Sequence, residues 1–216
     1  MTTCDRQRGF TLIELIVVLG ILGILLAAAV PMATAVLSAD RRQEARAELA
    51  TIAAALESYY LEHAAFPATL ADATFTGLHL QPGVDRTAAV DPFGAGQDYL
   101  YLVDATANTA SVWSRGENAR NNAGGTDDLL VVVHGAVPGT ARTWQRFRLI
   151  VELLADHIEA GGSVAGPWPV LRAAIGLGAA YDADGYGTPF DWNETTHTLT
   201  SAGPDRTLGT ADDITL

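Results

Sequence analysis

The stretch RGFTLIELIVVLGILGILLAAAVP, residues 8–31, has the composition of a membrane-spanning helix that carries one internal charge, Glu14. From Leu15 to Ala39 the chain has 25 residues without a charged side chain. At 1.5 Å per residue this run can cross a hydrocarbon core of about 30 Å. A carboxylate inside hydrocarbon costs on the order of 2.5 kcal/mol or more. Glu14 therefore either reaches back to water near the end of the span or has a function within the membrane.

The residues that flank the apolar run bear on its orientation and processing. Arg6 and Arg8 precede it and favour a cytoplasmic N-terminus, although the arginines at residues 41–42 weaken that signal. An ordinary secretory signal has an apolar core of about 7–15 residues followed by a cleavage site with small residues. Here the run is longer, and the small-residue junction of interest, Gly9–Phe10, lies before it.

Composition argues against several classes of function. The 216-residue chain has a formal net charge of −12, and all thirteen basic residues are arginine. No stripe of basic and aromatic side chains appears, so nucleic acid is not expected as a partner. The single cysteine, Cys4, excludes a disulfide within the chain. The five histidines are scattered, and no zinc-protease, P-loop or serine-hydrolase motif is present, so we do not expect an enzyme.

Periodicity predicts an α+β fold. Beyond Ala39 the helical pattern continues to Phe66-Pro67, which gives one helix of about 50 residues with a membrane half and an amphipathic half. Pro31 either kinks or locally melts this helix, or is tolerated as prolines in membrane helices often are. Residues 99–103 and 109–114 have the composition of paired strands. A second amphipathic helix is expected at residues 142–160. The apolar face of the first helix comprises Leu49, Ile52, Ala53, Leu56, Tyr60 and His63.

The run Arg8-Gly9-Phe10-Thr11-Leu12-Ile13-Glu14-Leu15 resembles the class III signal of type IV pilins and type II secretion pseudopilins. The resemblance implies that prepilin peptidase cleaves between Gly9 and Phe10 and methylates the new N-terminus at Phe10. Glu14 matches the family's glutamate, whose carboxylate would pair with the Phe10 amine of a neighbouring subunit during assembly. Pro31 matches a proline that the family commonly carries in this helix.

The two halves of the chain repeat a pattern. Residues 184–192 parallel residues 91–101, and residues 201–214 parallel residues 114–129. This similarity predicts duplication of a helix–strands–loop module. The expected organisation is a leader peptide (1–9), a transmembrane and filament-core helix (10–39), a first pseudopilin head (40–134), a Pro/Gly linker (135–141) and a second pseudopilin-like head (142–216).

The Asp/Pro/Gly/aromatic block and the acidic C-terminal loop also resemble the head of the major pseudopilin, whose C-terminal loop binds one calcium ion. The expected fold is therefore a long N-terminal helix packed on a small antiparallel sheet with a calcium-type loop, followed by a second, similar head. Calcium prefers oxygen ligands, although a solvated acidic loop is the alternative. The implied ligands are Ser201, Ala202, Asp205, Asp212 and Asp213, with a possible second Ca2+ site at Glu117, Asn118, Asp127 and Asp128.

The resemblance implies a structural pseudopilin of a type II secretion system. Such a chain crosses the inner membrane once, with its N-terminus in the cytoplasm and its heads in the periplasm, and then joins a short periplasmic filament that drives protein export. Its partners would be sister pseudopilins in a homo- or hetero-filament, prepilin peptidase and the inner-membrane assembly platform. The alternative is a minor type IV pilin whose extra head serves adhesion or binds a substrate or DNA.

Overall fold

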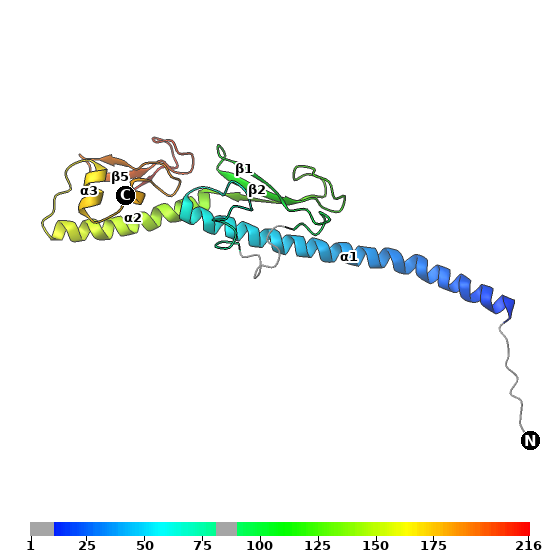
Figure 1. The fold of residues 1–216 in the computed structure, drawn as a ribbon. Helices are drawn as coiled ribbons and strands as arrows, with labels where there is room; N and C mark the ends of the chain where they lie inside the picture. The colour runs from blue at the N-terminus through cyan, green and yellow to red at the C-terminus, as the bar shows by residue number, and fades with distance from the viewer. Residues whose placement is uncertain (1–10, 81–89) are drawn as a thin grey trace, which may run out of the picture. The chain divides into compact units, whose positions relative to one another are not determined.

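The computed structural model describes residues 11–80 and 90–216 and shows an α+β fold (Figure 1). The chain divides into two compact units, residues 1–44 and residues 45–216. The second unit begins at Ala45, five residues later than the expected start of the first head at residue 40. Among the described residues of the long helix, Ala45 is the first with a fully buried side chain.

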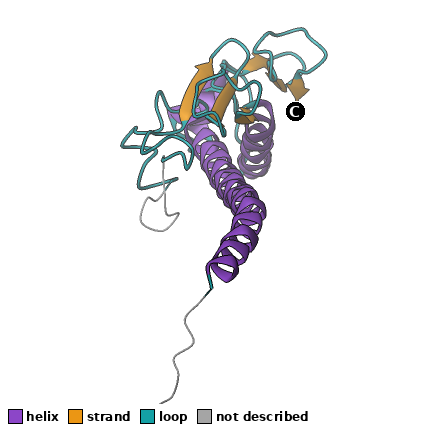
Figure 2. Ribbon diagram, turned by 90° about the vertical axis from the view of Figure 1, so that its right-hand side faces the viewer, coloured by secondary structure: helices purple, strands orange, loops and turns teal. Residues whose placement is uncertain are grey.

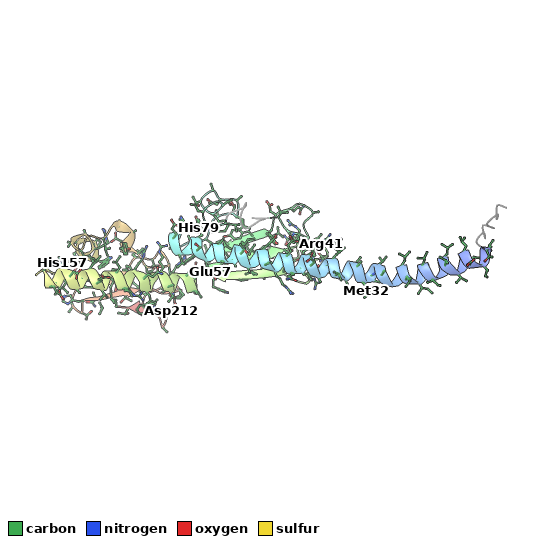
Figure 3. All side chains as sticks on the ribbon, turned by 90° about the horizontal axis from the view of Figure 1, so that it is seen from below. Met32, Arg41, Glu57, His79, His157 and Asp212 are labelled. Atoms are coloured by element: carbon green, nitrogen blue, oxygen red, sulfur yellow. The ribbon has the colours of Figure 1, made fainter. Side chains whose placement is uncertain are left out.

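Helix α1 (Leu12–His63) has 52 residues and runs unbroken through Pro31. The alternative in which this proline melts the helix is therefore wrong. The side chains of residues 12–27 and 29–37 are all exposed, and Figure 3 shows them standing out around the helix near Met32. Among the described residues, α1 is the one helix long and apolar enough to cross a membrane.

The first sheet consists of three antiparallel strands in the order β1 (Leu100–Asp104), β2 (Thr109–Ser114) and β3 (Leu129–His134). The prediction of strands at 99–103 and 109–114 is confirmed to within a residue, whereas β3 was not predicted. The sheet packs on the amphipathic half of α1, as the helical spacing of its apolar residues predicts. Their common core comprises Leu49, Ile52, Ala55, Leu56, Tyr59, Leu70, Phe75, Leu80, Tyr99, Ala110, Val112 and Val133.

The second sheet is also three-stranded and antiparallel, in the order β4 (Asp191–Asn193), β5 (Thr198–Ser201) and β6 (Ile214–Thr215). Figure 2 shows the strands of both sheets in orange among the purple helices. Before these strands come α2 (Ala136–Glu159), α3 (Trp168–Ala174) and the short 3-10 helix η1 (Ala179–Asp182). The core of this region comprises Phe147, Ile150, Trp168, Leu171, Ile175, Phe190 and Leu199.

The prediction of a linker at residues 135–141 is wrong, because α2 begins at Ala136 and not near residue 142. Pro138 lies in the first turn of α2, where a helix does not need the N–H that proline lacks. Gly139 is required by packing, since a Cβ at this position would lie 2.2 Å from Cε1 of Tyr186. The residues that resemble a linker thus form the start of a packed helix.

Candidate functional site: the N-terminal cap and two acidic loops

Glu14 lies in the first turn of α1, where it forms a reciprocal cap with Thr11. The Glu14 N–H donates to Thr11 Oγ1 over 3.3 Å, and the Thr11 N–H donates to Glu14 Oε2 over 3.4 Å. This is the arrangement of a capping box, in which a Thr and a Glu three residues apart satisfy two free N–H groups of the helix start. The Thr-x-x-Glu spacing is visible in the sequence, but its capping role was not predicted. Gly9 and Phe10 lie outside the described residues.

The first loop, residues 115–128, connects β2 to β3 and folds around its own carboxylates. Asp127 Oδ2 accepts a hydrogen bond of 2.8 Å from the Asn118 N–H. Asp128 Oδ2 accepts one of 3.0 Å from the Gly124 N–H. The bond from the Asn118 amide is the main cause that lowers the pKa of Asp127 below its ordinary value. The loop therefore holds Asp127 as a carboxylate.

The second loop, residues 202–213, connects β5 to β6 in the same manner. Asp212 Oδ2 accepts a hydrogen bond of 3.0 Å from the Asp205 N–H, and Asp213 Oδ2 accepts one of 2.7 Å from the Gly209 N–H. The hydroxyl of Thr210 donates to Asp212 Oδ1 over 2.6 Å. This hydroxyl above all, and then the Asp205 amide, lower the pKa of Asp212. Figure 3 labels Asp212.

One glycine in each loop makes room for the backbone opposite. Gly116 and Gly203 have φ of +62° and +66°, in the left-handed region that favours glycine. A Cβ on Gly116 would lie 2.3 Å from the carbonyl oxygen of Asp127, and a Cβ on Gly203 would lie 2.2 Å from that of Asp212. Both loops therefore close by the same backbone approach.

A buried aspartate supports the base of each loop. Asp91 is 1% exposed and accepts a hydrogen bond of 2.7 Å from the Ser114 hydroxyl. Asp184 is 0% exposed and accepts a hydrogen bond of 2.6 Å from the Ser201 hydroxyl. Sequence reasoning included both aspartates in the repeated blocks but missed their role. A signal for this role was present in the sequence, because each aspartate stands two residues before an aromatic residue. Asp184 precedes the serine that it contacts by 17 residues, and Asp91 precedes its serine by 23 residues.

The predicted ligands of the second loop occupy two different environments. Ser201 and Ala202 are buried. The Ser201 hydroxyl donates a hydrogen bond to Asp184 and accepts one of 3.2 Å from the Gly203 N–H. Ser201 thus supports the loop through its side chain. Asp205 is exposed and Asp212 and Asp213 are half-buried, all in the loop itself.

The predicted ligands of the first loop include one oxygen that lacks a partner. Glu117 and Asn118 are exposed, whereas Asp127 and Asp128 are half-buried. Asp128 Oδ1 is buried and has no hydrogen-bond partner among the described residues. Since buried polar atoms are nearly always paired, a hard cation fits this oxygen.

The loop carboxylates do not converge on a single point by themselves. Among the described residues, three acidic or imidazole side chains approach within 4.8 Å of one another at one place, and it lies outside both loops. A cation in either loop would therefore also need main-chain carbonyls, which calcium accepts readily.

Comparisons with known proteins assign most of the chain before α2. The model of the prokaryotic N-terminal methylation motif matches residues 4–30, and that of type II secretion system protein G matches residues 34–133. Neither of these two models extends past residue 133. No solved structure matches the chain.

Several relatives carry the name type II secretion system core protein G. The protein from Pseudomonas aeruginosa is 34% identical over 134 residues, which cover 57% of this chain and 91% of the relative. The Vibrio cholerae protein is 30% identical over 137 residues, covering 58% and 91%, and that of Pectobacterium carotovorum is 32% identical over 133 residues, covering 57% and 82%. The methylation motif together with the long apolar helix indicates membrane anchoring. The chain belongs to the type II secretion system protein G family, the pseudopilins of type II secretion, which are structural proteins and not enzymes.

Proposed function

We propose that the chain is made as a prepilin, cleaved by prepilin peptidase between Gly9 and Phe10, N-methylated at Phe10 and assembled into a short periplasmic filament that drives protein export. The observation that carries this proposal is the order of the two family matches, residues 4–30 and 34–133, with α1 (Leu12–His63) running unbroken from the first match into the second. Before assembly the protein crosses the inner membrane once, with its N-terminus in the cytoplasm and residues 45–216 in the periplasm.

The processing step is tested by mass spectrometry of the chain expressed with and without a prepilin peptidase. We expect a chain that begins at N-methylated Phe10 only when the peptidase is present, and no cleavage in a Gly9→Val variant. A chain that keeps Met1 in the presence of an active peptidase, one that cleaves a control prepilin in the same cells, would overturn the proposal.

In the filament, Glu14 would pair with the methylated amine of Phe10 in a neighbouring subunit. Two opposite charges in a low-dielectric bundle neutralise each other only in one axial register, so the pair would set the spacing of the subunits. The exposed side chains of residues 12–27 support this proposal, because a helix with no cover from its own chain needs lipid or other helices around it. Sister pseudopilins and the inner-membrane assembly platform are the partners that this arrangement requires.

We further propose that residues 136–216 are a second copy of the module formed by the amphipathic half of α1 and the first sheet. Three matched features support this. Each sheet is an antiparallel set of three consecutive strands, each acidic loop lies between the second and third strand, and each loop is tied by equivalent amide-to-carboxylate bonds.

Each acidic loop is proposed to bind one Ca2+ ion. In the first loop the unpartnered Asp128 Oδ1 supports this, and in the second the equivalent Asp213 is held in the same way by the Gly209 amide. The bound ion would neutralise the loop carboxylates and join β2 to β3, and β5 to β6, at their loop ends.

A minor pilin whose second module binds a surface or a substrate is the second candidate. The observation in its favour is that the two family models end by residue 133, which leaves residues 134–216 outside both matches. Immunogold labelling of the native cells separates the two. Label confined to the periplasm supports the secretion filament, whereas label along extracellular fibres supports the pilus.

A further inference from the structure

Three side chains gather near the end of α1, outside both acidic loops. Glu62 and His63 belong to the last turn of α1, and His79 comes from the segment that follows it. Each offers one ligand atom, and these atoms all lie within 4.8 Å of one another. We call Glu62, His63 and His79 the histidine cluster.

The position of His79 is fixed by the packing of its segment against α1. Phe75 is fully buried, and its carbonyl accepts hydrogen bonds from the N–H groups of His79 (3.0 Å) and Leu80 (3.1 Å). Leu80 is 1% exposed in the same core. Figure 3 labels His79 where the segment runs beside α1. The backbone therefore holds the His79 imidazole against the helix.

The two nitrogens of His79 have different surroundings. Nδ1 lies 3.0 Å from the hydroxyl of Ser58. Nε2 is buried and has no hydrogen-bond partner among the described residues, although Glu62 Oε2 lies 3.3 Å away, outside hydrogen-bond geometry. The side chain of His79 is only 8% exposed. Leaving a buried polar atom without a hydrogen bond is costly, and the contact that Nε2 does make is an ion pair with the Glu62 carboxylate of the same cluster.

His63 is oriented in a matching way. Its Nδ1 lies 3.1 Å from the carbonyl oxygen of Tyr59, and its ring stacks on the Tyr59 ring with centroids 4.0 Å apart. The Tyr59 ring also contacts that of His79 edge-on at 5.3 Å. Histidines that bind metals usually have the other ring nitrogen held by such an outer partner. In both histidines Nδ1 is engaged, which leaves Nε2 for a metal.

We propose that the histidine cluster binds a transition-metal ion of the Zn2+ type. Two imidazoles and one carboxylate are ligands that zinc accepts in tetrahedral geometry, with Zn–N distances of about 2.0–2.1 Å. In a zinc complex of this geometry the two coordinating nitrogens would lie roughly 3.3 Å apart. In the structure the centroids of the His63 and His79 imidazole rings are 6.0 Å apart. Glu62, with its side chain 66% exposed, can move to complete the set. The fourth position is open to water or to a ligand from a neighbouring molecule.

This site is independent of the proposed calcium loops. Its donors are mainly nitrogen, whereas those of the loops are oxygen, so the two sites select different ions. Failure of one proposal therefore leaves the other intact.

The test is isothermal titration calorimetry, in which ZnCl2 is added to the purified full-length chain in detergent at saturating Ca2+. All variants carry Cys4→Ser, so that the thiol cannot contribute. We expect one zinc ion per chain at the cluster, and Kd values raised about tenfold or more by His63→Gln and by Glu62→Gln. His134→Gln, at an exposed histidine of β3, and Asp128→Asn, in the first loop, serve as controls and should leave the Kd unchanged.

His63 and Glu62 carry the test because both side chains are exposed, so their replacement leaves the core intact, whereas the side chain of His79 is only 8% exposed. The proposal is overturned if zinc does not bind, or if His63→Gln binds it as tightly as the parent chain. X-ray absorption of the zinc-loaded chain provides a second readout. Two imidazole ligands are expected, and a spectrum without imidazole scattering would equally exclude the site.

Discussion

The hydroxyl of Ser201 donates a 2.6 Å hydrogen bond to the buried carboxylate of Asp184. The same carboxylate accepts the N–H groups of Tyr186 (2.9 Å) and Thr188 (2.8 Å). A turn that precedes β4 is thus tied to the last residue of β5, where the second loop begins. Asp91 and Ser114 make the equivalent bond of 2.7 Å at the base of the first loop.

Replacement of Ser201 by Ala should destabilise the protein because it removes one donor from a buried carboxylate. Hydrogen bonds to charged groups contribute about 1.5–3 kcal/mol each, so we expect a loss of this size in the free energy of unfolding. Chemical denaturation of the full-length chain in detergent, followed by tryptophan fluorescence, measures it. Thr195→Ala, at an exposed turn residue, is the control and should unfold as the parent chain does. Equal stabilities of the Ser201→Ala and parent chains would contradict the role given to this bond.

Replacement of Gly203 by Ala should disrupt the second loop. The φ of +66° costs a non-glycine residue about 1–2 kcal/mol, and the added Cβ would meet the Asp212 carbonyl oxygen at 2.2 Å. We therefore expect a clear fall in Tm. Gly178→Ala is a matched control, since a Cβ there has nothing within 4 Å and the backbone φ is −75°. A Gly203→Ala chain as stable as Gly178→Ala would show that the loop closes differently.

Chelation of calcium should lower the thermal stability of the head region. An ion that binds only the folded state stabilises by about 2.7 kcal/mol at a free concentration of 100 times its Kd. Tm measured in EGTA and after re-addition of Ca2+ checks this, with Mg2+ as the control ion. Asp213→Asn and Asp128→Asn each remove the negative charge of a proposed ligand and should each reduce the calcium-dependent rise in Tm. A Tm that is the same in EGTA and in Ca2+ would refute both calcium sites.

The loops should also lose stability in acid. Since hydrogen bonds lower the pKa values of Asp127 and Asp212 below the ordinary 3.8, these carboxylates stabilise the fold above pH 3.8. That contribution is lost as the pH falls through the lowered values. In calcium-free buffer, Asp127→Asn and Asp212→Asn should therefore have lower Tm than the parent at pH 7, and the difference should shrink towards pH 2. Asp156→Asn, at an exposed position of α2, should follow the parent at every pH. A difference that does not change with pH would rule out the ionic contribution.

Variants of Thr11 and Glu14 separate the helix cap from filament assembly. Thr11→Ala removes the hydroxyl of the cap, which costs about 1 kcal/mol at the helix start, but it keeps the Glu14 carboxylate. Glu14→Gln keeps a capping side chain but removes the charge. If the charge pairs with a neighbouring subunit, Glu14→Gln should abolish filaments while Thr11→Ala still forms them, with both chains in the membrane fraction. Electron microscopy of sheared cells and membrane fractionation provide the measurements, and filaments formed by Glu14→Gln would exclude the pairing.

The two long helices and the strands β1 and β2 were largely predictable because their apolar residues follow a clear period, whereas β3 and α3 were not predicted. The amphipathic half of α1 buries Leu49, Ile52 and Leu56, as the spacing indicates. The start of α2 was missed because Pro138 and Gly139 are typical of a linker. In the structure the proline occupies a helix position that needs no N–H, and the glycine makes room for Tyr186.

The sites were only partly predictable, because their geometry depends on contacts between distant segments. Asp127 and Asp212 could be selected by charge, but nothing in their spacing identifies Asp128 as the residue with an unpartnered buried oxygen. His63 and His79 are 16 residues apart and match no metal-binding motif. They meet only because Phe75 and Leu80 bury the intervening segment against α1.

Residues 12–27 and 29–37 of α1 are exposed, so a long apolar helix surface is not covered by the rest of the described chain. A single chain would place that surface in a bilayer, and in the filament proposed above neighbouring pseudopilins would cover it. Leaving the lipid and joining the fibre then become an exchange of one apolar solvent for another, with little net change in buried area. Such an exchange is close to balanced, so a modest input of work could drive the fibre to grow or to retract.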